Sequence, residues 1–317
     1  KWSGPEGGQV SLTGTVRESS GGTYRIRLES GEEVEATLRG RLKRASRAGD
    51  RVVIGDRVEI TVADDGSATV ESVLPRSTII ARRVLGGRRP KVVAANLDRL
   101  LVVMAARSPS PSLSTIDRFL VTAEAGGLEG VVVINKLDLP DAEEPASTLA
   151  WMYEAVGYPV HQVSAVSGRG MEELRAVLFS GWSALVGPSG AGKSTLLNAL
   201  DPALQLRTGA LSRTVDRGRH TTVTSRLIKL GCGGEVAETP GFSDVGIWGA
   251  DAESLEDCFP EFRPHLGQCR FRGCSHDHEP DCAVKKAVAE GEILQSRYES
   301  YQKLLGEARA IAPEPGG

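Results

Sequence analysis

A glycine-rich run that ends in a lysine and two hydroxyl side chains carries the clearest chemistry in the sequence. Residues 187–195 match the pattern G-x-x-x-x-G-K-[ST], follow an apolar run at 183–186 and open a predicted helix at 195–200. Glycines let backbone N–H groups wrap a phosphate, and the helix N-terminus adds a favourable dipole. We therefore predict a phosphate loop in which Lys193 pairs with the β- and γ-phosphates of a nucleotide and Ser194 binds Mg²⁺. The predicted nucleotide contacts in this loop are Gly187, Pro188, Ser189, Gly190, Ala191, Gly192, Lys193, Ser194 and Thr195.

A second short motif could read the base of that nucleotide. Residues 135–138 follow an apolar run and look like the NKxD motif of GTPases. The Asp138 carboxylate can accept the ring N–H and the exocyclic amine of guanine, a donor pair that adenine lacks, while the stem of Lys136 covers the base. The tetrapeptide alone could equally be a surface turn, but Ser164 and Ala165 end the next predicted strand, where a backbone N–H can meet the guanine oxygen. The residues predicted to bind the base are Asn135, Lys136, Leu137, Asp138, Ser164 and Ala165.

The order of these motifs along the chain is unusual. Ordinary GTPases place the phosphate loop first, then the two switches, then the base-reading motifs, whereas here the base-reading motifs precede the phosphate loop. The same sheet can form if the chain is cut after switch II and the old ends are joined through the predicted helix at 171–179. The order therefore predicts a circularly permuted GTPase. Since switch II would then lead directly into the C-terminal region, a nucleotide-dependent movement could pass into that region along the chain.

Two segments after the phosphate loop fit the switches. Residues 217–222, Arg-Gly-Arg-His-Thr-Thr, resemble switch I, and we favour Thr222 over Thr221 as the side chain that binds Mg²⁺ and the γ-phosphate. Residues 238–241, Glu-Thr-Pro-Gly, occupy the switch II position, where aspartate is usual. Glu238 is one methylene longer, yet it still permits a water-mediated contact to Mg²⁺. The Gly241 N–H is expected to meet the γ-phosphate.

The residue that would orient the attacking water differs from the usual glutamine. Phe242 stands at that position, which predicts slow intrinsic hydrolysis or a different group that positions the water. His220 is the candidate for that role, although it could instead fold switch I or contact a partner. The predicted catalytic residues are thus Lys193, His220 and Thr222, and the predicted magnesium ligands are Ser194, Thr222 and Glu238.

Three of the five cysteines lie close together near the C-terminus with a histidine among them. Three thiolates and one imidazole in a closed set of four suit a tetrahedral structural Zn²⁺ site. His278, and less strongly His265, could replace the histidine of that set, and Cys232 and Cys258 are predicted to be plain thiols outside it. The predicted zinc ligands are Cys269, Cys274, His276 and Cys282.

The elements that must position these residues fall into three predicted domains, residues 1–75, 76–246 and 247–317. The first domain shows about five short alternating strands with glycine-rich turns, which predict a small β-barrel of the OB-fold type. A basic linker at 76–90 leads to the second domain, whose fully apolar runs alternate with helical stretches, as in a parallel sheet covered on both faces. The apolar runs of the second domain lie at 100–104, 131–134, 160–163, 184–186, 227–230 and 235–237. The third domain is the zinc-binding region, which is helical and polar from 283 to about 310.

Composition and charge narrow the class further. The chain has 317 residues, 40% of them hydrophobic and 25% charged, with no apolar run long enough to span a membrane and no signal-peptide core at its start, so we expect a cytoplasmic protein. We also expect the protein to be a monomer. The formal net charge is −3, yet residues 36–91 carry thirteen Lys or Arg against six Asp or Glu. Such a stretch could attract a phosphate backbone or could simply be a solvated face.

Together, the basic barrel, the permuted motif order, the run Gly-Arg-His-Thr-Thr and the Cys-x4-Cys-x-His-x5-Cys cluster resemble the RsgA/YjeQ family of GTPases that depend on the small ribosomal subunit. The resemblance covers nearly the whole chain. It implies an N-terminal OB-fold, a central GTPase and a C-terminal zinc domain. It also implies binding to the small ribosomal subunit and its rRNA late in maturation, with GTP hydrolysis stimulated by that subunit. Glu238 departs from the family pattern.

Two other classes of function remain open at the level of the sequence. One is an RNA-binding assembly scaffold with a degenerate nucleotide site, although the complete phosphate loop argues against it. The other is an NTPase that acts on a different RNA without the ribosome. Stimulation by the small subunit would indicate the ribosome-dependent GTPase, and stimulation by naked RNA alone would indicate the NTPase that acts on a different RNA. Measured GTP turnover would separate both enzymes from the scaffold.

Overall fold

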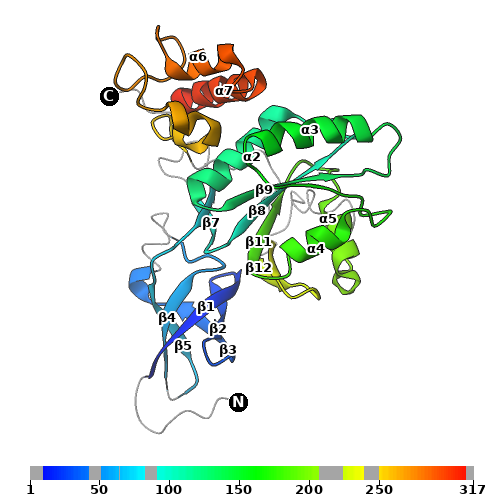
Figure 1. The fold of residues 1–317 in the computed structure, drawn as a ribbon. Coiled ribbons are helices and arrows are strands. Elements are labelled where there is room, and N and C mark those ends of the chain that lie inside the picture. The colour runs from blue at the N-terminus through cyan, green and yellow to red at the C-terminus, as the bar shows by residue number, and fades with distance from the viewer. Residues whose placement is uncertain are drawn as a thin grey trace.

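The computed structural model describes residues 10–42, 51–63, 65–82, 91–206, 224–238 and 250–311. A barrel near the N-terminus and a helical unit near the C-terminus lie at opposite ends of the molecule, with a helix-covered sheet between them (Figure 1). The three regions follow the order expected from the sequence, and the predicted fold class is confirmed.

The barrel forms from five strands in the order β1-β2-β3-β5-β4, and a further pairing of β4 with β1 closes it. β3 and β5 are parallel and the other pairs are antiparallel, as in an OB-fold. Buried and exposed residues alternate along β2, β3 and β4, so one face fills the barrel and the other faces outward. The strands are β1 (Val10–Ser20), β2 (Thr23–Leu28), β3 (Glu33–Leu38), β4 (Arg57–Val62) and β5 (Ala68–Val73).

The predicted basic linker contains structure that the sequence did not indicate. β6 (Ile79–Arg82) pairs antiparallel with β7 (Lys91–Ala95) as a separate two-stranded sheet. β6 has only four residues and the pairing shifts register after Ile80, so no sustained alternation marks it in a charge-rich segment. The segment between the barrel and the central sheet therefore contains an antiparallel strand pair, the β6–β7 pair.

The central sheet has the strand order β10-β9-β8-β11-β13-β12. All neighbouring pairs are parallel except β12 with β13. The strands are β8 (Arg99–Ala105), β9 (Glu129–Asn135), β10 (Val160–Gln162), β11 (Trp182–Val186), β12 (Ser225–Lys229) and β13 (Glu235–Glu238). They coincide with the apolar runs in the sequence.

Helices cover both faces of this sheet, which explains why its central strands are apolar throughout. Leu100 and Val102 of β8 pack in one cluster with α2 (Leu113–Gly126) and α3 (Glu143–Ala155). The alternate residues Leu101 and Val103 pack in another cluster with α4 (Met171–Val177) and α5 (Lys193–Leu200). Since successive side chains of a strand point to opposite faces, a strand between two helical layers must be apolar at every position.

The barrel and the central sheet join through backbone pairing. β1 pairs antiparallel with β12, placing Glu18 opposite Arg226 and Ser19 opposite Ser225, so the two units form one 11-stranded sheet. Next to this seam Arg17 forms an ion pair with Glu235, and its guanidinium lies 5.5 Å from the centre of the Trp182 ring. The barrel is thus attached to the strand that follows the predicted switch I.

The C-terminal unit docks against α2, on the outer side of the central domain (Figure 1). Val121 of α2 belongs to the same hydrophobic cluster as Leu304 and Leu305. On the same helix Arg118 forms two hydrogen bonds to Glu307, of 2.6 and 2.8 Å. The C-terminal unit contains the 3-10 turns η2 (Glu256–Cys258) and η3 (Pro260–His265) and the helices α6 (Ala283–Glu290) and α7 (Gln295–Ile311).

None of the helices in the described ranges is long and apolar enough to cross a membrane.

A fully buried arginine holds this docking in place. The Arg297 side chain on α7 is 1% exposed and lies 2.6 Å from carboxylate oxygens of both Asp117 on α2 and Glu261. Its guanidinium also lies 4.7 Å from the centre of the Phe259 ring, and Tyr153 of α3 donates a hydrogen bond to Asp117. Burial opposes the charge, but the two carboxylates outweigh burial and raise the pKa of Arg297 well above its usual value.

Replacing Arg297 with methionine should destabilise the protein strongly. The change leaves two buried carboxylates without their cation, a loss that costs about 3–5 kcal/mol. Urea denaturation should show a lower free energy of unfolding, with the C-terminal unit separating first. Arg309→Met is the matched control, because Arg309 pairs with Asp277 at the surface and such pairs contribute about 0.2–1 kcal/mol. Equal effects of the two substitutions would contradict the assigned role of Arg297.

Candidate functional site

The predicted phosphate loop joins the end of β11 to the start of α5. Gly187 has a φ of 140°, and a Cβ on this residue would lie 2.0 Å from the carbonyl oxygen of Val103. Gly192 has a φ of 95°, and a Cβ there would lie 2.4 Å from Nδ2 of Asn135. Both positions therefore require glycine, because the loop must approach β8 and the base-reading motif closely.

The lysine of the loop is buried and its ammonium group is turned back over the loop. Lys193 Nζ donates hydrogen bonds to the carbonyl oxygens of Gly187, at 2.6 Å, and Pro188, at 3.1 Å. Ser194 is also buried, in the first turn of α5. The loop thus gathers one cation, one hydroxyl and the N-terminus of a helix, which together suit an anionic phosphate chain.

Asn135 connects the predicted base-reading motif to the phosphate loop. Its Nδ2 donates a hydrogen bond to the carbonyl oxygen of Ala191 at 3.1 Å. Its Oδ1 accepts a hydrogen bond from the backbone N–H of Ala165 at 3.3 Å. One buried amide therefore holds three loops that are separated in sequence. The neighbouring Lys136 has a φ of 69°, and its ammonium donates to the carbonyl oxygen of Ser108.

Ser164 fixes the carboxylate predicted to read guanine. Its hydroxyl donates a hydrogen bond of 2.6 Å to Oδ1 of Asp138. The same oxygen of Ser164 accepts the backbone N–H groups of Val166 and Ser167. The structure brings these residues together at the edge where β9 and β10 end.

The predicted switch residues fall mainly outside the described residues. Thr221, Thr222 and His220 do so, as do Gly241 and Phe242.

Glu238 is described, at the end of β13. Its Oε2 accepts a hydrogen bond of 2.7 Å from Nε of Arg226, which lies opposite it on β12. Arg226 was not among the predicted site residues, because a single arginine in a strand carries no motif.

The predicted metal ligands converge in the C-terminal unit. Their sulfur and nitrogen atoms all lie within 4.8 Å of one another, with three of the residues buried and Cys269 partly buried. Nδ1 of His276 lies 3.3 Å from Sγ of Cys282 and 3.5 Å from Sγ of Cys269. Burial raises the pKa of Cys274 to about 12, so the thiol needs a nearby cation to ionise at neutral pH. Three soft sulfurs and one imidazole nitrogen, mostly buried, fit a tetrahedral divalent ion.

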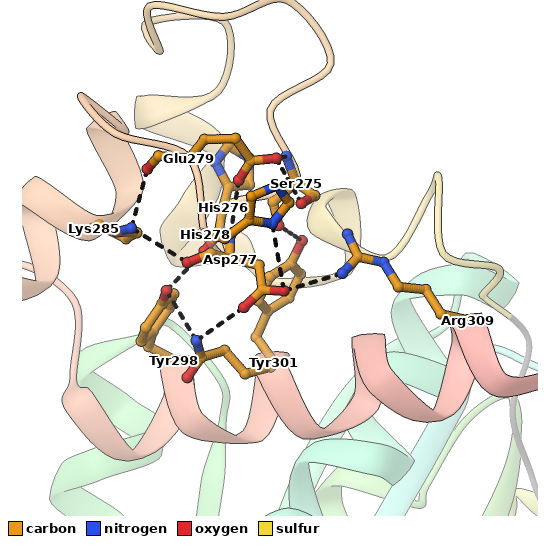
Figure 2. A network of polar contacts seen from close by, with 10 residues as sticks. Ser275, His276, Asp277, His278, Glu279, Lys285, Tyr298, Tyr301 and Arg309 are labelled. Carbon is orange, nitrogen blue, oxygen red and sulfur yellow. Dashed lines mark hydrogen bonds and ion pairs between the residues drawn. The ribbon is translucent and has the colours of Figure 1, made fainter.

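The loop that carries the histidine is anchored to α7 and to itself (Figure 2). Tyr298 and Tyr301 donate hydrogen bonds to the carbonyl oxygens of His276 and Ser275. Glu279 accepts the N–H and the hydroxyl of Ser275 and the N–H of Asp277. Burial opposes ionisation of Glu279, but these hydrogen bonds outweigh it and lower its pKa to about 2. The loop therefore keeps its shape over the pH range in which Glu279 stays ionised.

The alternative ligands lie away from the cluster. The His278 side chain is 77% exposed, and His265 lies 3.6 Å from Glu292. Cys232 and Cys258 are free thiols outside the set. Burial raises the pKa of Cys258 to about 12, as expected for an unreactive packed thiol.

Comparison with known proteins agrees with this architecture. The family model described as "RsgA GTPase" matches residues 73–248. A protein of Gemmatimonas aurantiaca named small ribosomal subunit biogenesis GTPase RsgA is 47% identical over 301 residues, which is 94% of this chain and 98% of the relative. The protein of the same name from Thermotoga maritima is 41% identical over 88% of this chain and 90% of its own length.

Solved structures give the same result. The crystal structure of YjeQ from Thermotoga maritima superposes with a TM-score of 0.76 at 36% identity, covering 95% of this chain and 99% of that one. The crystal structure of YloQ, a circularly permuted GTPase, superposes with a TM-score of 0.71 at 29% identity, covering 96% of this chain and 98% of that one. The fold and the order of the motifs thus define a circularly permuted P-loop GTPase. The chain belongs to the RsgA GTPase family.

Loss of one cysteine of the cluster should abolish metal binding. Cys274→Ser replaces a thiolate with a hydroxyl that does not ionise, so metal analysis of the dialysed protein should fall from about one equivalent of divalent ion to near zero. Cys258→Ser is the control, because Cys258 is buried in the same unit but lies outside the cluster. Retention of the ion by Cys274→Ser would show that this sulfur is not a ligand.

Proposed function

We propose that this protein hydrolyses GTP to GDP and phosphate on the small ribosomal subunit and assists late maturation of that subunit. The observation that carries the proposal is the position of Asn135, whose amide contacts both the phosphate loop and the loop of Ala165. One nucleotide can therefore have its phosphates and its base held at the same time. The relatives described above are named for biogenesis of the small ribosomal subunit, and the partner is inferred from them.

In the proposed complex, the phosphate loop surrounds the phosphates and Asp138 accepts two hydrogen bonds from guanine. Lys193 would leave the carbonyl groups that it now contacts and pair with the β- and γ-phosphates. The N–H of Ala165 would face the guanine oxygen. Because adenine offers no matching donor pair to Asp138, the site should select guanine nucleotides.

Magnesium fits the hard oxygen groups at the edge of the loop. Ser194 is buried at the start of α5, and Glu238 ends the strand that pairs with β11. These two residues, with Thr222 and the phosphates, would hold the ion, which neutralises the charge that develops on the phosphate oxygens. Thr222 and His220 keep their proposed roles in catalysis, His220 as the group that positions the attacking water in place of the usual glutamine. The N–H of Gly241 is the proposed contact from switch II to the γ-phosphate.

The partner surface is proposed to be the basic side of the barrel and the β6–β7 pair. An open groove of about 540 Å³ is lined by Arg41, Arg51 and Arg76 together with Glu71. Desolvation lowers the pKa of Lys91, and the nearby charges of Arg51 and Arg82 lower it further, so several cations gather here. Clustered guanidinium groups suit the phosphate backbone of rRNA.

The cluster of Cys269, Cys274, His276 and Cys282 is proposed to hold a structural Zn²⁺, which would stabilise the C-terminal unit through its four ligands.

The domain boundaries are proposed at residues 75 and 246, and the protein is proposed to act as a cytoplasmic monomer. A protein with this assignment cycles between GTP and GDP while its two outer domains contact the subunit.

Purified small ribosomal subunits should stimulate GTP hydrolysis by the full-length protein. Turnover measured as released phosphate should be slow for the protein alone, because Phe242 replaces the usual glutamine, and faster with the subunit. Large subunits and naked rRNA are the matched controls, and Lys193→Ala should lose the stimulated rate. Stimulation by naked RNA alone would favour an NTPase that acts without the ribosome. Absence of turnover under all conditions would favour an RNA-binding scaffold.

The base specificity should follow Asp138. An Asp138→Asn variant loses the carboxylate that guanine requires, so GTP affinity should fall about 10- to 100-fold, as expected for hydrogen bonds to a charged group, while xanthosine triphosphate binding should improve. Fluorescent nucleotide titration measures both. Asp141→Asn is the control, because Asp141 pairs with Arg107 outside the motif. A variant that still prefers GTP would remove Asp138 from base recognition.

A further inference from the structure

The imidazole of His276 is buried among the cysteines of the cluster, two aromatic rings and Glu256. Nδ1 faces the sulfurs of the cluster, at 3.3 Å from Cys282. The rings of Phe262 and Tyr301 lie 6.2 and 6.4 Å from the imidazole, centre to centre. The remaining ring nitrogen, Nε2, lies 2.8 Å from Oε2 of Glu256. The side chain is only 3% exposed, so water offers little alternative to this contact.

The two ring nitrogens therefore have separate tasks. A histidine that binds a metal through Nδ1 carries its proton on Nε2, and leaving that N–H buried without an acceptor is unfavourable. The contact to Glu256 has ion-pair distance but is not aligned as a hydrogen bond, and Nε2 has no other hydrogen-bond partner among the described residues. The Glu256 side chain is 32% exposed and can turn to complete the bond.

We infer that Glu256 is a positioning residue of the metal centre, which accepts the Nε2 proton of His276 and keeps Nδ1 directed at the ion. The inference rests on the proposed zinc site. A carboxylate behind a metal-binding imidazole fixes its tautomer and orientation and makes it a better ligand, and loss of such a partner costs about 10- to 100-fold in metal affinity.

The contact with Glu256 also joins the metal centre to a segment that packs against the central domain. Glu256 begins η2, in the segment that follows residues 239–249 and precedes the ligands themselves. η2 lies against α2 of the central domain, and Glu261 a few residues later forms the buried pair with Arg297. The metal centre is therefore held to the first described segment after the central sheet, and not only to its own loop.

Zinc affinity of the full-length protein tests the inference. Competition with a chromophoric chelator should give a dissociation constant about 10- to 100-fold weaker for Glu256→Ala than for the parent protein. Glu256→Gln retains a carbonyl oxygen that can accept the Nε2 proton, so its affinity should lie between the two. Glu253→Ala is the control, because Glu253 is an exposed acid of the same segment outside the contact. The Co²⁺-loaded variants should keep a tetrahedral absorption spectrum, since the four ligands are unchanged.

The outcomes separate the two proposals. If the parent protein binds no zinc, the proposed zinc site itself is wrong. If the parent binds zinc and Glu256→Ala binds it equally well, Glu256 does not position the ligand, even if the variant melts at a lower temperature. If Glu253→Ala weakens zinc binding as much as Glu256→Ala does, the loss of affinity comes from the charge of the segment, and the inference is likewise overturned.

Discussion

The parallel alignment of three central strands is the constraint on which the nucleotide site depends. β8 lies between β9 and β11 and pairs in register with both, Ala105 beside Asn135 and Val102 beside Val186. The carboxyl ends of parallel strands meet at one edge, so the loops after β9 and β11 must lie together there. The sheet does not depend on which loop comes first in the chain. Permutation of the motifs therefore leaves the geometry of the site intact.

The permutation instead changes what is attached to the sheet. The barrel joins through main-chain hydrogen bonds between β1 and β12, whereas the C-terminal unit joins through side chains, above all Arg297 and its two carboxylates. These two kinds of junction respond differently to sequence change. A backbone ladder tolerates most substitutions, while a buried charge tolerates very few.

Much of this architecture could be predicted from local patterns. Alternating residues marked the five barrel strands, and continuous apolar runs marked the six strands of the central sheet, because burial on one face or on two leaves a direct trace in the sequence. The motifs also marked the loops that the structure brings together around Asn135, and the spacing of Cys269, Cys274, His276 and Cys282 marked the cluster.

The features that escaped prediction depend on long-range contacts. The pairing of β1 with β12 uses main-chain groups about two hundred residues apart, and such groups leave no side-chain pattern. Arg297 lies in a helix rich in polar residues, where a charge usually indicates exposure, yet its neighbours bury it completely. Glu256 is one of many acidic residues in the sequence, and only its contact with Nε2 of His276 distinguishes it from the others.

The seam between β1 and β12 has a mechanical consequence. A closed barrel is stiff, because every strand is hydrogen-bonded on both sides. The chain that enters β4 gives it a second attachment, since Ile54 pairs with Ala94 and packs in the same cluster as Leu100 of the central sheet. A stiff body held at two places moves as one piece, so a displacement of β12 is passed to the whole barrel and not only to β1.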